Sequence, residues 1–385
     1  MKKCVVISDS FKGTLSSLEI CQIAHSAISE IFPTCDVIGI PVADGGEGTV
    51  DCFREALGAE VVTIPVQGPF GEIVQAGYAR KGNLAVVEMA AAAGLPLVGD
   101  RGDPSGTTTY GVGQLIRHAV EGGCTEILLG IGGSATNDGG CGCAAALGTR
   151  FYDASGTEFV PVGKTLDKIA AFDNTGTRAF LAEVRVTVMC DVENPLYGPA
   201  GAAYVFAPQK GADADMVQML DGQLRVLDKL FCRELGRSFA ELAGAGAAGG
   251  LGAGCMAFLG AELKSGIEAV LDTVEFDRQA EGADLVITGE GRIDSQSVHG
   301  KVISGVAKRT QEKGIPLIAL VGGIDESADG AYDLGVTAIF SINREAKAFS
   351  ESAPHSAENY RRTLRDICRL LRGYKGRKAE PTIVK

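Results

Sequence analysis

The two ends of the chain share a pattern that the middle lacks, in which short apolar runs alternate with stretches of helical periodicity. Near the amino terminus the run CVVISD precedes a helical pattern over residues 14–32, where Ser16 and Glu19 have capping-box spacing. The run DVIGIPV then precedes a second helical stretch, VDCFREALG. From Ala283 the alternation returns with ADLVITGEG, VISGVAKRTQEKG and IPLIALVGG. Strands that alternate with helices favour a parallel sheet, so we expect an α/β, Rossmann-like domain with an open parallel sheet built from both termini.

The middle of the chain predicts a different arrangement. The apolar runs EVVTIPV, EIVQAGYAR and NLAVVEMA are joined by connections too short for crossover helices, so they should pair antiparallel. Further apolar runs and a long helical pattern from about Ala212 to Leu235 follow. We therefore expect residues 63–274 to form a mixed α+β domain inserted into a domain of residues 1–62 and 275–385. Two linking segments suit a hinge, and we place the active site in the interdomain cleft.

Composition narrows the class of ligand. The net charge of −12 over 385 residues argues against nucleic acid and anionic membranes as partners. The amino terminus is too polar for a signal peptide, and no tract has the bulky apolar residues of a membrane span. Eleven scattered cysteines without a CxxC motif predict packed thiols. We expect a cytoplasmic protein that acts on small molecules, and the sequence leaves homo-oligomer formation open.

Four polar loops follow predicted strands, where ligands bind in open parallel sheets. Each loop alone is equally well explained as an ordinary turn, but an arginine between two acids in GRID is more than a turn requires. Carboxylates near a lysine and an arginine suit phosphoryl transfer, in which Mg²⁺ binds carboxylate and phosphate oxygens. The loops are SDSFKG (Asp9, Lys12), ADGGEGT (Asp44, Glu47), CDVENP (Asp191, Asn194) and TGEGRID (Glu290, Arg292, Asp294).

The glycine-rich loop GIGGSATNDGG, residues 130–140, offers backbone amides and hydroxyls as an anion cradle. It lacks the lysine of a Walker A loop. Its GxGxxA match, and a GxGxxG match over residues 244–249, keep dinucleotide binding open, although neither has the expected strand-to-helix context. The nucleotide-binding candidates are Gly132, Gly133, Ser134, Thr136 and Asn137.

A hydroxyl cluster, Thr107, Thr108 and Thr109, stands before a predicted helix. A helix amino terminus attracts a phosphate or a carboxylate, but N-capping explains such hydroxyls equally well. His299 is the histidine nearest a candidate loop, and we interpret it as structural.

Six blocks between Asp9 and Lys301 together resemble the type I family of bacterial glycerate kinases. They are DSFKGTLSS, PVADGGEGT, GDPSGTTTYGVGQLI, GIGGSATNDGG, CDVENPL and TGEGRIDSQSVHGK, in this order. The resemblance implies phosphorylation of D-glycerate by ATP with Mg²⁺, in a Rossmann-like domain that carries an inserted α/β domain. It favours the 2-phosphate product and leaves the 3-phosphate as the alternative. A nicotinamide-dependent hydroxy-acid dehydrogenase and a non-catalytic glycerate-binding module are the competing classes.

The resemblance also suggests roles for the candidate residues. Asp191 is the expected base, Lys12 faces the phosphates, and Arg292 with the threonine cluster binds the glycerate carboxylate. Further substrate contacts are expected from Asp9, Asn194 and Glu290, and the metal ligands from Asp44 or Asp294.

Overall fold

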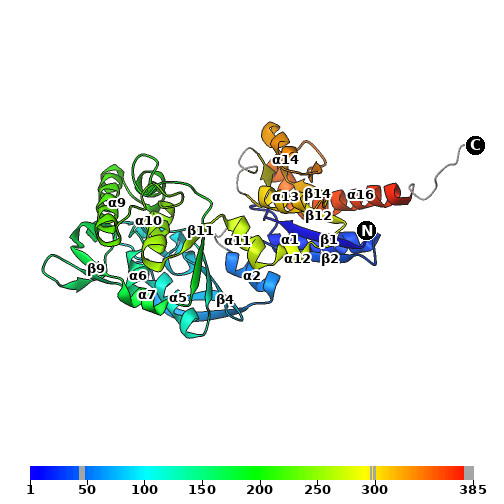
Figure 1. Ribbon diagram of the computed structural model, residues 1–385. Coiled ribbons are helices and arrows are strands. Elements are labelled where there is room, and N and C mark those ends of the chain that lie inside the picture. Colours follow the sequence, from blue (N-terminus) through cyan, green and yellow to red (C-terminus); the bar gives the residue numbers. More distant parts are fainter. Residues whose placement is uncertain (43–47, 295–296, 298–300, 377–385) are drawn as a thin grey trace, which may run out of the picture. The chain divides into compact units, whose positions relative to one another are not determined.

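The computed structural model describes residues 1–42, 48–294, 297 and 301–376, and its contacts divide the chain into two compact units (Figure 1). The first unit comprises Met1–Ala43 and Val270–Lys385, and the second comprises Asp44–Ala269. Residues 44–62 and 270–274 thus fall on the other side of the boundaries expected from the sequence. The reason is pairing: β3 (Glu60–Gln67) joins the sheet of the second unit through β4 (Ile73–Lys81), and α2 (Thr49–Leu57) contacts β4.

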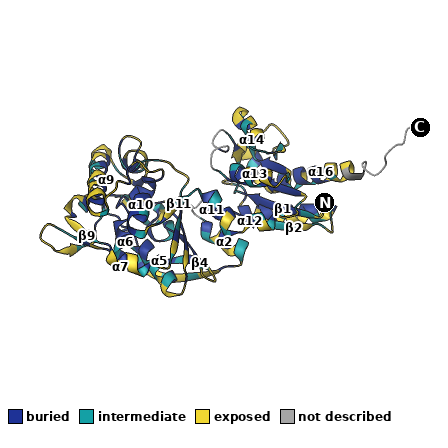
Figure 2. Ribbon diagram, viewed as in Figure 1, coloured by how far each residue is buried: buried dark blue, intermediate teal, exposed yellow. Residues whose placement is uncertain are grey.

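The first unit is built on a five-stranded sheet with the order β16-β14-β12-β1-β2, and every pair is parallel. Strands from both termini are therefore neighbours, which confirms the predicted α/β class. The central strands β1 and β12 are buried along almost their whole length, as Figure 2 shows. The strands are β1 (Lys3–Ser8), β2 (Asp36–Pro41), β12 (Leu285–Thr288), β14 (Leu317–Val321) and β16 (Ala338–Ser341).

Helices of the first unit bury their apolar faces in the core of this sheet. The helix α1 (Ser17–Ile31) begins at the predicted capping box, in which the Glu19 amide donates to the Ser16 hydroxyl at 3.2 Å and the Glu19 carboxylate accepts from the Ser16 amide at 2.8 Å. It packs against α16 (Ser356–Gly376), whose Tyr360 lies edge-on to Phe11 with ring centroids 6.0 Å apart. The other helices include α11 (Gly266–Thr273), which crosses the boundary between the units, α12 (Phe276–Gln279), α13 (Val302–Glu312) and α14 (Gly330–Asp333).

The second unit contains a six-stranded mixed sheet with the order β11-β10-β6-β5-β4-β3. The expected antiparallel pairs β3–β4 and β4–β5 are confirmed, whereas β5, β6, β10 and β11 run parallel. Its remaining strands are β5 (Leu84–Glu88), β6 (Glu126–Gly130), β10 (Arg185–Met189) and β11 (Glu262–Lys264), and its main helices are α5 (Tyr110–Glu121), α6 (Cys141–Leu147), α9 (Ala214–Leu235) and α10 (Ala247–Gly254).

Close packing explains two glycines of the block GDPSGTTTYGVGQLI. A Cβ on Gly111 would come within 2.0 Å of the Gln67 carbonyl oxygen, and one on Gly113 within 2.3 Å of the Cys143 carbonyl oxygen. These glycines therefore let α5 lie directly against β3 and α6. In the part of the chain that the structure describes, no helix is long and apolar enough to cross a membrane.

Candidate active site

Two of the predicted polar loops meet at the carboxyl ends of neighbouring strands in the first unit. The Asp9 amide, just after β1, donates to the Gly289 carbonyl at 2.9 Å, and the Ser8 hydroxyl donates to the same oxygen at 2.9 Å. Gly291 lies against the Lys12 backbone, since an added Cβ would be 3.5 Å from the Lys12 nitrogen. The loops of Asp9 and Glu290 are thus brought together, as expected where parallel strands end side by side.

Glu290 is a buried carboxyl group of this loop pair. The residue is only 6% exposed, and its Oε1 has no hydrogen-bond partner among the described residues. Burial raises the pKa of Glu290 to about 7, opposed by a Ser297 hydrogen bond and the Lys301 charge and supported by the charges of Asp9 and Asp294. This carboxyl group therefore changes protonation near neutral pH, which suits a functional site.

Arg292 is held by a carboxylate that the sequence did not single out. Its guanidinium lies 2.5 Å from Asp325, and its side chain is 67% exposed. The Arg292 hydrogen bond is the main cause that lowers the pKa of Asp325 to about 2. The short strands β13 (Arg292–Ile293) and β15 (Gly323–Ile324) run parallel and bring the two residues together. Any anion bound by Arg292 would share the guanidinium with this ion pair.

Of the two predicted metal ligands, Asp294 alone lies within the described residues. Asp44 lies outside the described residues, as do Glu47 and His299. Asp294 forms a turn in which its amide donates to the Ser297 hydroxyl at 3.0 Å and its carboxylate accepts from the Ser297 amide at 3.3 Å. Within the described ranges, no group of three or more histidine, cysteine or acidic side chains is arranged to hold a metal ion.

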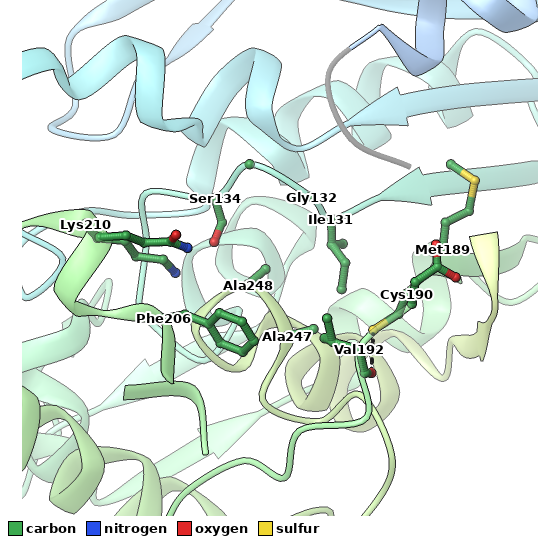
Figure 3. A pocket seen from close by; sticks show the side chains of 13 residues that line it. Ile131, Gly132, Ser134, Met189, Cys190, Val192, Phe206, Lys210, Ala247 and Ala248 are labelled. Carbon is green, nitrogen blue, oxygen red and sulfur yellow. Dashed lines mark hydrogen bonds between the residues drawn. The ribbon is translucent and has the colours of Figure 1, made fainter. Parts of the chain in front are cut away.

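In the second unit, the glycine-rich loop and the CDVENP loop border one cavity of about 330 Å³ (Figure 3). They do so because β6 and β10 are parallel neighbours, so both loops leave the same edge of the sheet. Four predicted site residues are thereby brought together, namely Gly132, Gly133, Ser134 and Asp191. One carboxylate oxygen of Asp191 accepts a hydrogen bond from the Gly266 amide at 2.7 Å, which orients the side chain. The other lining residues are Ile131, Met189, Cys190, Val192, Phe206, Gln209, Lys210, Ala247 and Ala248.

Thr136 and Asn137 are fully buried instead of lining the cavity. The Thr136 hydroxyl and both amide atoms of Asn137 lack hydrogen-bond partners in the described part of the chain. A left-handed run over residues 248–250 packs on them, and a Cβ on Gly249 would lie 2.0 Å from the Thr136 carbonyl oxygen. Only glycine fits there.

The glycine-rich loop and the GxGxxG match at residues 244–249 therefore contact each other. The Gly139 amide donates to the Gly249 carbonyl at 3.1 Å. Neither motif forms a dinucleotide fingerprint. The helix α6 begins only at Cys141, well after the GxGxxA match, and the match at residues 244–249 does not follow a strand.

The threonine cluster forms hydrogen bonds with the glycine-rich loop. The Thr107 hydroxyl donates to the Ala135 carbonyl at 2.9 Å, and the Thr109 hydroxyl and amide both donate to Asp138 at 2.8 Å. The Thr108 hydroxyl accepts from the Tyr110 amide at 3.2 Å. All three threonines are buried, so their described contacts are structural and favour the interpretation that these hydroxyls serve the fold.

Asn194 is used within its own loop. Its side-chain amide donates to the Ala200 carbonyl at 2.8 Å, and its backbone carbonyl accepts from the Gly246 amide at 2.9 Å. It therefore fixes the turn beside the cavity and is not one of the lining residues.

Two charged residues near the cavity were missed by the sequence reasoning. Asp138 is fully buried, and burial raises its pKa against the hydrogen bonds from Thr109, Gly140 and Gly142. Lys210 is 2% exposed, and its ammonium donates to the Thr136 carbonyl at 2.7 Å. Burial lowers the pKa of Lys210 to about 7, with the Asp138 charge opposing. The segment APQKGAD has no motif that could have identified this lysine.

Three comparisons with known proteins match this chain to glycerate kinases over nearly its whole length. The model of the glycerate kinase family matches residues 4–372. The chain is 45% identical to a Bacillus subtilis glycerate kinase, over 96% of this chain and 98% of that protein. It is 42% identical to Escherichia coli glycerate 2-kinase, with the same coverage. A Salmonella typhimurium LT2 crystal structure, provisionally named glycerate kinase 2, aligns with a TM-score of 0.87 at 42% identity, over 97% of this chain and 99% of that chain. This chain belongs to the glycerate kinase family.

Proposed function

We propose that this protein transfers the γ-phosphoryl group of ATP to the 2-hydroxyl group of D-glycerate. The family membership supports a kinase, and the relative named glycerate 2-kinase supports the position of transfer. The observation that carries the proposal is the cavity of the second unit, where a carboxylate stands beside a glycine-rich loop. Phosphoryl transfer needs a phosphate cradle and a group that accepts the hydroxyl proton, and this cavity offers both.

Asp191 is the proposed base. Its carboxylate would accept the proton of the glycerate hydroxyl as the hydroxyl oxygen attacks the γ-phosphorus and the bond to the β-phosphate oxygen breaks. The Gly266 amide holds one carboxylate oxygen and so limits rotation of the side chain. The segment from Gly132 to Ser134 would hold the nucleotide phosphates. In the first unit, Lys12 and Arg292 are the proposed cations for phosphate and glycerate.

Magnesium is the expected metal, and the residues of the first unit fit its ligand chemistry. Mg²⁺ prefers carboxylate and phosphate oxygens with several waters, so a protein supplies only one or two carboxylates. Glu290 has a buried oxygen without a described partner, and the charges of Asp9 and Asp294 act on it. We propose Asp294 as one ligand, and as the second either Glu290 or Asp44, which lies outside the described residues. When bound, the ion would neutralise phosphate charge during transfer.

A coupled assay with D-glycerate, ATP and Mg²⁺ tests the reaction, and phosphorus NMR identifies the product. We expect formation of ADP and 2-phosphoglycerate only when all three components are present. Absence of ADP formation with glycerate would refute the kinase function. A 3-phosphate product would leave the kinase intact but refute the assigned hydroxyl.

The role of Asp191 is tested by Asp191→Asn, which keeps the shape of the side chain but removes its basicity. We expect kcat to fall by about a hundredfold or more while nucleotide and glycerate still bind. Asp215→Asn, at an exposed position of α9 in the same unit, is the matched control and should keep wild-type kinetics. Near wild-type turnover in Asp191→Asn would contradict the assignment.

A further inference from the structure

The cavity of the second unit has a cation that none of the sequence motifs indicated. A nucleotide polyphosphate is strongly anionic, yet the candidate residues predicted for this cavity are glycines, a serine and the carboxylate of Asp191. Of the lining residues that the structure describes, Lys210 alone carries a positive charge when protonated. Figure 3 draws its side chain in the same half of the view as Ser134, and both residues line the cavity.

Lys210 is oriented by a single described hydrogen bond. Its ammonium donates to the Thr136 carbonyl at 2.7 Å, which ties it to the glycine-rich loop. An ammonium group has three N–H donors, so two donors remain after this bond, and no further acceptor is found among the described residues. A lysine that is 2% exposed cannot satisfy these donors with bulk water to the usual extent.

The positive charge of Lys210, like its hydrogen-bond donors, is only partly compensated by the described residues. Burial favours the neutral amine and lowers the pKa of Lys210 to about 7, although the charge of Asp138 opposes this change. The Asp138 carboxylate already accepts hydrogen bonds from Thr109, Gly140 and Gly142. An anion entering the cavity would supply both the missing acceptors and a compensating charge.

We propose that Lys210 binds a phosphoryl group of the nucleotide in this cavity, together with the loop segment from Gly132 to Ser134. This inference rests on the proposed function, because it takes the cavity to be the nucleotide site. Lys210 would then have two roles. Its ammonium donates one N–H group to the Thr136 carbonyl and its remaining N–H groups to phosphate oxygens. A lysine fixed in this way contacts the phosphate without having to be ordered on binding.

Lys210→Gln separates these two tasks. Glutamine can still donate to the Thr136 carbonyl but carries no charge, whereas Lys210→Met removes both the donor and the charge. Calorimetric titration with ADP should show Kd rising by about ten- to a hundredfold in both variants, as expected for a lost hydrogen bond to a charged group. Lys210→Arg, which keeps the charge, should bind ADP more tightly than Lys210→Gln. The KM for D-glycerate should change by less than about threefold.

Asp228→Asn is the matched control for general destabilisation of the second unit. Asp228 is also buried, and it accepts hydrogen bonds from the Ser238 hydroxyl at 2.8 Å and the Phe239 amide at 2.9 Å, away from the cavity. This variant should lower the thermal unfolding temperature without changing the Kd for ADP. An equal loss of ADP affinity in Asp228→Asn would show that destabilisation alone explains the effect.

Wild-type ADP affinity in Lys210→Gln would overturn the proposal and leave Lys210 as a tether of the loop. If the variants do not fold, an experiment on the wild-type protein still tests the proposal. Acetylation of Lys210 by acetic anhydride, followed by peptide mass spectrometry, should be slower with ADP bound, and an unchanged rate would overturn the inference. Failure of the proposed function is distinguishable, since the wild-type protein would then form no phosphoglycerate whatever its affinity for ADP.

Discussion

Glu290 makes the stability of the first unit depend on pH in a direction that can be calculated. Its pKa rises from 4.5 to about 7 because the carboxyl group is buried beside Asp9 and Asp294. Between these two values the folded protein keeps a proton that the unfolded chain has lost. Stability is therefore favoured at low pH and falls as the pH rises towards 7, after which this contribution stays constant.

The change Glu290→Gln removes the titration and leaves a side chain of nearly the same shape. For a single group with these two pKa values, the free energy of unfolding should fall by roughly 2.5 kcal/mol between pH 5 and pH 8, at 1.36 kcal/mol per pKa unit. The variant lacks this contribution. The stability of the variant relative to wild type should thus increase by about 2 to 3 kcal/mol over the same interval. Packing differences that do not depend on pH cancel in this comparison, as does the titration of Lys210.

Urea denaturation followed by circular dichroism measures this difference, with EDTA present and substrates absent at both pH values. Glu312→Gln, at an exposed position of α13, is the control and should follow wild type. A difference between Glu290→Gln and wild type that stays constant within about 0.5 kcal/mol from pH 5 to pH 8 would refute the reasoning, because the pKa of Glu290 would then be the same in the folded and unfolded states.

Three other substitutions test the packing and the ion pairs. Gly249→Ala should destabilise the protein by more than about 1 kcal/mol in urea denaturation and weaken ADP binding, because the methyl group meets the Thr136 carbonyl at 2.0 Å at a φ of +67°. Gly222→Ala in α9, where an added Cβ meets nothing within 4 Å, should instead be neutral or stabilising, and the opposite order of the two would contradict the argument. Arg309→Met should lower the free energy of unfolding by about 1 to 3 kcal/mol, since the 17% exposed guanidinium pairs with both Asp272 and Asp277, and a change below about 0.5 kcal/mol would show that these pairs contribute little.

The fold class was predictable because local periodicity and connection length determine it. The run CVVISD is nearly continuous in apolar residues, as a strand covered on both faces must be, and it forms β1, an interior strand of the sheet. The short connection after β3 forces an antiparallel neighbour, and β4 is that neighbour. The boundaries of the two units were harder to predict from the sequence, because they depend on which sheet each strand joins. A strand's own residues carry little information about its partner strand.

The candidate site shows the same division between local and long-range information. Polar loops at strand ends were recognisable, since Asp9 and Glu290 each stand within three residues of the end of an apolar run. The partners were not, because Asp325 reaches Arg292, and Lys210 reaches Thr136, only through the tertiary fold. The threonine cluster has hydroxyl groups suited to an anion site, yet its described contacts are with buried backbone and Asp138. Sequence proximity to a helix start could not distinguish these two uses.

The polar side chains buried in the glycine-rich loop indicate why the turn that packs on them needs glycine. An unpartnered buried polar atom costs about 1 to 3 kcal/mol, and the side chains of Thr136 and Asn137 contribute three such atoms among the described residues. Bulkier residues at positions 249 and 250 would push the covering turn away and let water reach these groups, at the expense of the loop's shape. Glycine at those positions keeps the turn in direct contact, and the ammonium of Lys210 donates a hydrogen bond to the Thr136 carbonyl. The segment from Gly132 to Ser134 is therefore presented to the cavity by a rigid, costly support, which is the arrangement expected where a ligand compensates for the cost.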